Sequence, residues 1–536
     1  MHTNRISRLW LLPTRLVFGL ALVLAHLFAH ADAPRPAPVD ARQLALRLDA
    51  SGMQPDWLGA GQAQARLALR LLRNAPAHGL DPRRYGTEDL ARRLDTLAGA
   101  EASAAFERDL STSILQFLAD LHFGRIFSAY RQPYGTPGQF DPVTYLAEAA
   151  RTGRLEQAVQ AAAPAIPLYR RVQQTLAEYR ELAALYPTWP ALPAVQAKGI
   201  VAGTPYAGAA LLRERLHLLG DLDPDADVAT GDDTVYTAEL AAAVRRFQSR
   251  HGLAENGVLG PQTLGALGVP LRHRVVQLEL TLERLRWLPP LPPGRFIAVN
   301  LPSYHLWAFD SRDNTLEPRL EMRVIVGTAA RTPTPLFIGQ MRYLEFNPYW
   351  NVPRSIEVGE ILPKLARNPA YLRQNDMELV TANGTVLPDG TGDPAAALRA
   401  GTVRVRQRPG ASNVLGSVKF AMPNPMNIYL HSTSARELFK RSRRDLSHGC
   451  IRVEQPNALA EFVLADPQRW DAIKVEAAIA EGRTRTVPLP APVAVILFYA
   501  TAVTDRQGRA LFADDVYRRD APLINALGAI SSLQAR

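Results

Sequence analysis

The spacing of hydrophobic residues divides the chain into a helical part and a later part rich in strands. From 41 to 195 the apolar residues recur at helical spacing, and those in 110–121 would share one helix face. Beyond Arg295 the period changes to two, as in 320–326, where every second residue is apolar. We therefore predict a multidomain α+β protein with a helical N-terminal scaffold and a mostly-β domain.

Residues 205–270 predict a compact module of three short helices. Leucines at helical spacing in 212–219 mark the first helix, Thr237 is a candidate N-cap of the second, and Pro261 opens the third. The apolar pattern of the next segment, 271–292, predicts a connecting helix that a pair of prolines ends. Whether this helix packs on the N-terminal helices stays open at this level.

Strand candidates then follow one another through a domain at 293–480. They are 296–301, 305–309, 320–326, 343–346, 402–407, 417–422 and 427–430. Residues 354–400 interrupt the pattern with helical and Gly/Asp/Pro-rich stretches, so we predict an insertion, which could serve as a lid or be inert decoration. Residues 481–536 would be a C-terminal extension of the same domain.

The N-terminus has the layout of a secretory signal peptide. Residues 1–31 contain arginines without an acid, an apolar run at 16–25, and an Ala-His-Ala cleavage pattern at 29–31. The apolar run is short for a membrane span, although an uncleaved anchor is the alternative. Residues 32–40 hold closely spaced prolines and predict an extended linker.

The amino-acid composition limits the kinds of protein and of binding partner that fit this chain. The chain has 61 Lys and Arg against 51 Asp and Glu, a formal charge of +10, with 47% hydrophobic residues, so wholesale disorder is excluded. The positive charge predicts an anionic partner, and export argues against nucleic acid in that role. With one cysteine, the chain forms no internal disulfide and no cysteine-only zinc site.

That cysteine, Cys450, is the main candidate for chemistry. A thiol is mostly protonated at neutral pH, so a nucleophilic cysteine needs an imidazole nearby, and His431 and His448 are the two candidates. A buried core cysteine is the alternative, but the polar Ser447 and His448 argue against it. Gly449 allows close approach of a substrate and could aim amide groups at a developing oxyanion.

Two stretches resemble known domains. The FQ, HGL, NG and GPQTL elements of 243–264 resemble a peptidoglycan-binding domain, with a degenerate spacer module as the alternative. His431 followed by Ser447-His448-Gly449-Cys450 resembles the signature of the YkuD-type L,D-transpeptidase catalytic domain. Further blocks extend the likeness to the large, YcbB-like subgroup. These blocks are 346–353, 361–364, 423–425, 498–501 and 515–517.

The resemblance implies a periplasmic enzyme that forms 3→3 cross-links between peptidoglycan stem peptides through a thioester on a tetrapeptide stem. Cys450 would be the nucleophile, and His431 the base or ion-pair partner. The Ser432 carbonyl would hold the His431 ring, and Ser447 and His448 would shape the site. The resemblance further implies that the Gly449 and Cys450 amides form an oxyanion hole. Tyr429 and Arg452 would contact the substrate. Family members carry Asn or Arg two positions after the cysteine, so an asparagine-based role does not carry over to Arg452.

Two other functions stay open. Water could resolve the same thioester, which would make the protein an L,D-carboxypeptidase or hydrolase, or the chain could be a non-catalytic wall-binding scaffold. We expect no cofactor and no metal, since no HExxH pattern occurs, and a zinc site from His431, His448 and Cys450 is the remote alternative. Stem peptides are the expected partner, and no protein partner is predicted.

Overall fold

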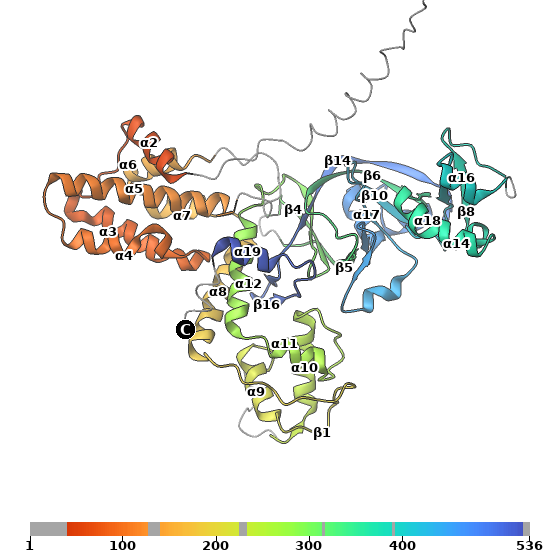
Figure 1. Ribbon diagram of the computed structural model, residues 1–536, viewed down its shortest axis with the longest axis horizontal. Coiled ribbons are helices and arrows are strands. Elements are labelled where there is room, and N and C mark those ends of the chain that lie inside the picture. The colour runs from red at the N-terminus through yellow and green to blue at the C-terminus, as the bar shows by residue number, and fades with distance from the viewer. Residues whose placement is uncertain (1–39, 127–139, 224–232, 314–316, 389–391, 529–536) are drawn as a thin grey trace, which may run out of the picture.

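A computed structural model of the chain has a helical region, a small helical module and a mostly-β region with a barrel-like sheet (Figure 1). The predicted multidomain α+β architecture is therefore confirmed. The structure describes residues 40–126, 140–223, 233–313, 317–388 and 392–528. The predicted signal peptide, and all but the last residue of the linker, lie outside this part of the chain. Within it, no helix combines the length and the apolar composition that crossing a bilayer requires.

The N-terminal region is built around α5 (Ala100–Phe123). The surrounding elements are α2 (Ala41–Ser51), α3 (Gly59–Arg73), η1 (Ala75–His78), η2 (Pro82–Tyr85), α4 (Thr87–Asp95), α6 (Pro142–Thr152), α7 (Leu155–Ala162) and α8 (Pro167–Leu185). The predicted apolar face of α5 is confirmed, since Leu110, Ile114 and Phe117 are at most 1% exposed. Full burial of such side chains contributes about 1.5–3 kcal/mol each, so this face holds the helices together.

The small module contains α9 (Ala209–Leu218), α10 (Ala238–Arg250) and α11 (Pro261–Leu267) around one core. The Leu240 N–H donates to the Thr237 hydroxyl over 3.2 Å, which confirms the predicted N-cap. The sequence reasoning missed two short paired strands, β1 (Thr204–Pro205) and β2 (Val235–Tyr236).

The connecting helix α12 (Leu271–Leu285) packs against α8 (Figure 1). Val172 and Leu176 of α8 share a hydrophobic cluster with Leu278 and Leu282 of α12. Because the module lies between α8 and α12 in the chain, it is inserted into a helical scaffold. This answers the question that the sequence left open.

A nine-stranded sheet forms the β region. Its order is β12-β5-β13-β11-β10-β6-β14-β3-β4, and a further pairing of β4 with β5 closes it into a barrel-like form. The strands are β3 (Arg295–Asn300), β4 (His305–Asp310), β5 (Leu320–Gly327), β6 (Ile338–Phe346), β10 (Val418–Ala421), β11 (Leu430–His431), β12 (Asp445–Ser447), β13 (Ile451–Val453) and β14 (Arg485–Phe498). Helices α17 (Pro456–Leu464) and α18 (Ala472–Ala480) contribute to its core. The extension after residue 480 thus supplies β14, which lies between β6 and β3.

Residues 350–407, called the inserted unit below, form a separate sheet of β7 (Trp350–Asn351), β9 (Val403–Gln407) and β8 (Met377–Thr381). Its helices are α13 (Arg354–Ile356), η3 (Glu357–Ile361), α14 (Leu362–Arg367), α15 (Tyr371–Gln374) and α16 (Pro394–Ala400). The predicted bounds, 354–400, are too narrow. The strand expected at 402–407 exists as β9, but it pairs with β7 and β8 rather than with the large sheet, and the unit has its own hydrophobic core.

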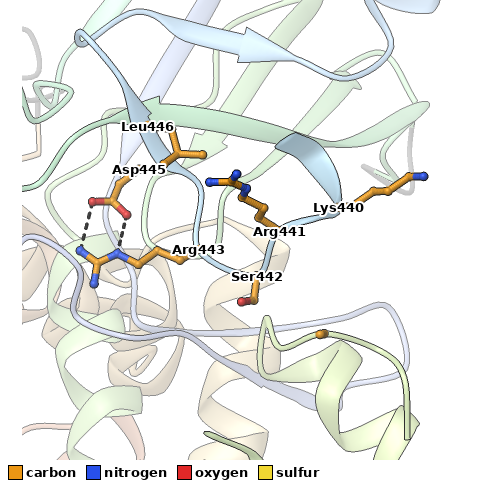
Figure 2. Close-up of a pocket in the computed structure, with 7 residues that line it drawn as sticks. Lys440, Arg441, Ser442, Arg443, Asp445 and Leu446 are labelled. Atoms are coloured by element: carbon orange, nitrogen blue, oxygen red, sulfur yellow. Dashed lines mark hydrogen bonds and ion pairs between the residues drawn. The ribbon is translucent and has the colours of Figure 1, made fainter. Parts of the chain in front are cut away.

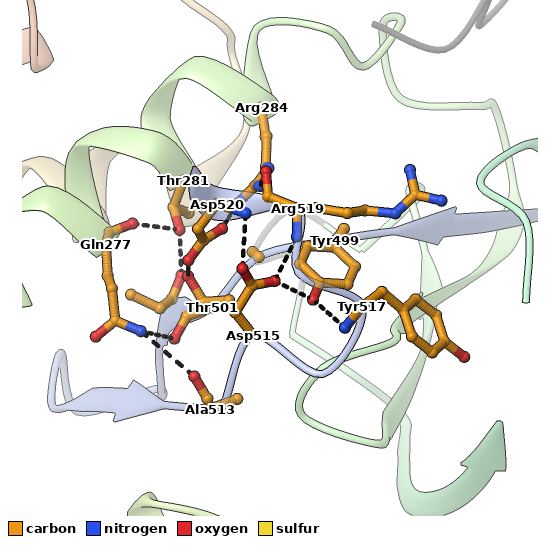
Figure 3. Close-up of polar contacts among 12 residues, drawn as sticks. Gln277, Thr281, Arg284, Tyr499, Thr501, Ala513, Asp515, Tyr517, Arg519 and Asp520 are labelled. Atoms are coloured by element: carbon orange, nitrogen blue, oxygen red, sulfur yellow. Dashed lines mark hydrogen bonds and ion pairs between the residues drawn. The ribbon is translucent and has the colours of Figure 1, made fainter. Parts of the chain in front are cut away.

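The C-terminal segment joins the scaffold to the large sheet. After β14 it forms the hairpin β15 (Ala502–Thr504) and β16 (Ala510–Phe512), followed by α19 (Asp520–Leu527). Arg284 of α12 is paired with Asp520 over 2.6 Å, and Asp520 also accepts a hydrogen bond from Thr501 over 2.7 Å (Figure 3). The scaffold and the β region are therefore connected by buried polar contacts as well as by the chain.

Candidate active site

Cys450 lies in the loop between β12 and β13, and its side chain is half-buried. Strand β11 runs parallel to β13, with Leu430 opposite Ile451 and His431 opposite Arg452. Leu430 and Ile451 point into the hydrophobic core, so by strand alternation His431 and Arg452 face the other side. The pairing of β11 with β13 thus brings His431 and the residue directly before β13, Cys450, to the same part of the sheet.

His431 is held as a neutral imidazole with one unprotonated nitrogen. Its Nδ1 lies 2.6 Å from the carbonyl oxygen of Ser432, which can only accept a hydrogen bond, so Nδ1 carries the proton and Nε2 keeps a lone pair. Burial and the charge of Arg452 lower the pKa of His431 to about 3, although the Ser432 and Leu415 carbonyls act in the opposite direction. At neutral pH this imidazole is therefore uncharged.

The thiol of Cys450 is hydrogen-bonded to the main chain. Its Sγ donates to the carbonyl oxygen of Asn427 over 3.6 Å, and among the described residues no hydrogen bond joins it to His431. The resting site is therefore a neutral thiol close to a neutral imidazole, rather than a thiolate–imidazolium pair. A proton transfer to His431 would have to accompany the attack on a substrate.

The surroundings of Cys450 act in opposite directions on the pKa of its thiol. Burial raises the pKa of Cys450 above its ordinary value. Hydrogen bonds from the main chain and the hydroxyl of Tyr429, together with the charges of Lys419 and Arg452, act against that rise because they favour the thiolate. The same four contacts would stabilise the sulfur once it has lost its proton.

We expect the alkylation of Cys450 by iodoacetamide to accelerate with pH, with a midpoint above 9.0, the ordinary thiol value. Only the thiolate reacts, and a raised pKa means that the proton is lost at higher pH. Intact-mass kinetics between about pH 6 and pH 11 measure this rate, and every adduct reports on Cys450 because the chain has one cysteine. A plateau reached already near neutral pH would instead indicate an ion pair with His431.

Ser447 closes the loop that carries the nucleophile. Its hydroxyl accepts a hydrogen bond from the Gly449 N–H over 3.2 Å and donates to the Cys450 carbonyl over 2.5 Å. The Gly449 N–H thus has an acceptor in this structure, and its expected role in an oxyanion hole stays a prediction. The Cys450 N–H donates no hydrogen bond among the described residues and stays available for that role.

His448 contacts the inserted unit. Its Nε2 lies 2.5 Å from Oε1 of Glu360 in η3, and both side chains are about half exposed. In a continuous strand, His448 and Cys450 would point to the same face, but 447–450 turns between two strands, so that relation does not hold. Nothing in the sequence pointed to Glu360.

Sequence reasoning also missed residues that stabilise the nucleophile loop, which is the name used below for residues 447–450, through hydrogen bonds to its main chain and to the neighbouring Gly327. The Thr334 hydroxyl donates to the Gly449 carbonyl over 2.8 Å, and the Gly327 N–H donates to the same hydroxyl over 2.8 Å. The Tyr517 hydroxyl donates to the Gly327 carbonyl over 2.7 Å. Of these residues only Tyr517 lay in a block that resembled a family, and its role was not apparent there.

An open, positively charged hollow lies next to this loop (Figure 2). Its volume is about 510 Å³, and it is lined by Ala254 of the small module and by residues of 440–446. Arg443 is paired with Asp445, whereas Lys440 and Arg441 are exposed and form no ion pair with a described residue. The hollow would therefore attract anionic groups. Within the described residues, no three histidine, cysteine or carboxylate side chains form a group that could hold a metal ion.

Family models match three segments of the chain. Residues 294–487 match the L,D-transpeptidase catalytic domain (YkuD), and residues 49–176 match a scaffold domain. Residues 207–267 match a domain provisionally described as peptidoglycan-binding. The first match contains Cys450 and His431 together with the inserted unit, and it ends within β14.

Individual proteins are also similar. A Haemophilus influenzae protein provisionally named an L,D-transpeptidase is 35% identical over 244 residues, which cover 46% of this chain and 48% of the relative. The match thus spans about half the length of that relative. The solved structure of an L,D-transpeptidase from Xylanimonas cellulosilytica is 16% identical and covers 57% of this chain and 99% of its own, with a TM-score of 0.17, which is too low for a comparison of folds.

Proposed function

We propose that this protein, in which residues 294–487 form an L,D-transpeptidase catalytic domain and 207–267 a peptidoglycan-binding domain, makes 3→3 cross-links in peptidoglycan. The observation that carries the proposal is the half-buried Cys450 thiol, in the residue directly before β13, the strand paired with β11, which carries His431 with its Nε2 unprotonated. A base and a nucleophile so placed suit covalent acyl transfer. The export signal expected at 1–31 supports a periplasmic location.

In the first step, Cys450 attacks the carbonyl carbon of the third residue of a tetrapeptide stem while its proton passes to Nε2 of His431. The carbonyl oxygen gains negative charge, which the Cys450 N–H can stabilise. The C–N bond to the terminal D-alanine then breaks, and His431 returns the proton to the leaving amine. The product is a thioester on Cys450 and free D-alanine.

In the second step, the side-chain amine of diaminopimelate on a neighbouring stem attacks the thioester. His431 accepts a proton from the attacking nitrogen, the C–S bond breaks, and the sulfur recovers a proton from the imidazole. The new amide joins the third residues of two stems. No external energy source is needed, because the energy of the first peptide bond is retained in the thioester.

The charge around the site suits carboxylate-bearing stems. Arg452 lies close enough to Cys450 to influence its pKa, and its buried Nε has no hydrogen-bond partner in the described structure. Lys440 and Arg441, at the hollow shared with the small module, would attract further carboxylates. Glu360, which contacts His448, places the inserted unit at the nucleophile loop, where it could restrict the access of water.

Incubation of the purified protein with disaccharide tetrapeptides tests the proposal. We expect mass spectrometry to detect cross-linked dimers together with one D-alanine released per dimer, since each thioester is resolved by an amine. Trimmed tripeptides without dimers would show that water resolves the thioester, and the protein would be an L,D-carboxypeptidase. No release of D-alanine at all would contradict any enzymatic role and leave the wall-binding scaffold.

A further inference from the structure

The hydroxyl of Tyr517 bridges main-chain groups of Gly327 and Thr334, two residues that adjoin Gly449 of the nucleophile loop. It donates to the Gly327 carbonyl over 2.7 Å and accepts from the Thr334 N–H over 3.2 Å. Tyr517 is itself held from the C-terminal segment, because its N–H donates to the Tyr499 hydroxyl over 3.0 Å, which donates to Asp515 (Figure 3). Its hydroxyl is therefore fixed on both sides.

Thr334 connects Tyr517 to the nucleophile loop, because it contacts both Tyr517 and Gly449. Its hydroxyl accepts from the Gly327 N–H and donates to the Gly449 carbonyl, both over 2.8 Å, and Thr334 is fully buried. Gly327 and Gly449 are in backbone contact, since a Cβ added to Gly327 would lie 2.9 Å from the Gly449 Cα. A shift of the 327–334 segment would therefore move Gly449.

The carbonyl of Gly449 and the N–H of Cys450 belong to one planar peptide group and point in opposite directions. Fixing the carbonyl at Thr334 thus fixes the direction of the Cys450 N–H. Gly449 has a φ of +113°, a conformation that side-chain-bearing residues rarely adopt, so the peptide would turn easily without such a support. The Cys450 N–H has no acceptor among the described hydrogen bonds and is free to receive one.

We propose that Tyr517 is a positioning residue, which acts through Thr334 to hold the Gly449–Cys450 peptide so that the Cys450 N–H points at the oxygen of the attacked carbonyl. The inference rests on the proposed acyl transfer. Tyr517 lies beyond the segment that matches the catalytic-domain model, 294–487, so this chain draws part of the support for its nucleophile from its C-terminal segment.

Tyr517→Phe removes the hydroxyl and keeps the ring. We expect the kcat for D-alanine release from a tetrapeptide to fall about tenfold with little change in KM, because a misdirected donor weakens binding of the transition state and not of the substrate. Alkylation of Cys450 by iodoacetamide has no oxyanion, so its rate should stay within about twofold of that of the parent protein. Disturbance of the thiol itself would slow both reactions.

Thr334→Val provides a second test, with the same expected split between the two reactions, and Thr334→Ser should restore D-alanine release because it keeps the hydroxyl. Tyr85→Phe is the matched control, since Tyr85 is buried in the helical region and donates to Asp120 over 3.0 Å. Unchanged kcat in both Tyr517→Phe and Thr334→Val, or an equal loss in both reactions, would overturn the inference. Absence of D-alanine release from the parent protein would instead overturn the proposed function.

Discussion

Replacing Cys450 with alanine is expected to abolish cross-linking and D-alanine release. The substitution removes the atom that forms the thioester, and loss of a covalent nucleophile lowers enzymatic rates by at least about 10³-fold. The fold should change little, because the side chain is half-buried and the surrounding strands are held by main-chain pairing. Mass spectrometry of the products and thermal unfolding of the variant measure the two effects.

Binding to sacculi is the internal control for this variant. The small module has its own hydrophobic core, so Cys450→Ala should bind sacculi as the parent protein does. Cys450→Ser is a matched companion, since its hydroxyl fits the same place but ionises far less readily, and we expect it to be inactive as well. Cross-linking by either variant would mean that a different group attacks the stem peptide.

The helical parts were predictable because their signals are local. Thr237, Pro261 and the apolar spacing within 212–219 each act within one or two turns, and α9, α10 and α11 form where these signals lie. The short paired strands β1 and β2 escaped notice, because two-residue segments have no period to detect. Insertion of the module between α8 and α12 depends on packing between distant segments, which one sequence does not show.

Long-range pairing explains what was missed in the β region. Strand β14 contains Pro488, Pro490 and Pro492, which argue against a strand, but its pairing with β6 is irregular between Pro488 and Val493, so the prolines are accommodated there. The inserted unit was placed too narrowly because β9 has the same alternating pattern as strands of the main sheet, while β7, with two residues, has no period to detect. Which sheet a strand joins depends on its partner.

The candidate site was predictable at the level of residue types and less so in its hydrogen bonds. Cys450 and His431 were identified by the chemistry that a nucleophile requires, and the structure places His431 on β11 and Cys450 directly before β13, the strand paired with β11. The direction of the Gly449 N–H could not be foreseen, because it depends on the turn that Ser447 closes. Tyr517 supports this loop through contacts that span much of the β region's sequence.

Replacing His431 with asparagine is expected to lower acyl transfer by about 10²–10⁴-fold, the usual contribution of a general base. Asparagine can still donate an N–H to the Ser432 carbonyl, but it has no nitrogen lone pair to accept the thiol proton. Because the pKa of His431 is about 3, the ring is already uncharged at working pH, so the loss cannot come from a missing positive charge.

The pH dependence separates proton transfer from a structural role of this histidine. As the pH rises toward the raised pKa of Cys450, solvent removes the thiol proton, so the part of the His431→Asn defect that comes from thiol deprotonation should shrink, while the part that comes from protonation of the leaving amine should remain. His122→Asn is the matched control, since His122 in the helical region also places Nδ1 near a main-chain carbonyl, that of Ala162, at 3.1 Å, and its replacement should leave the rate unchanged. A defect of constant size at every pH would mean that His431 does not take the thiol proton.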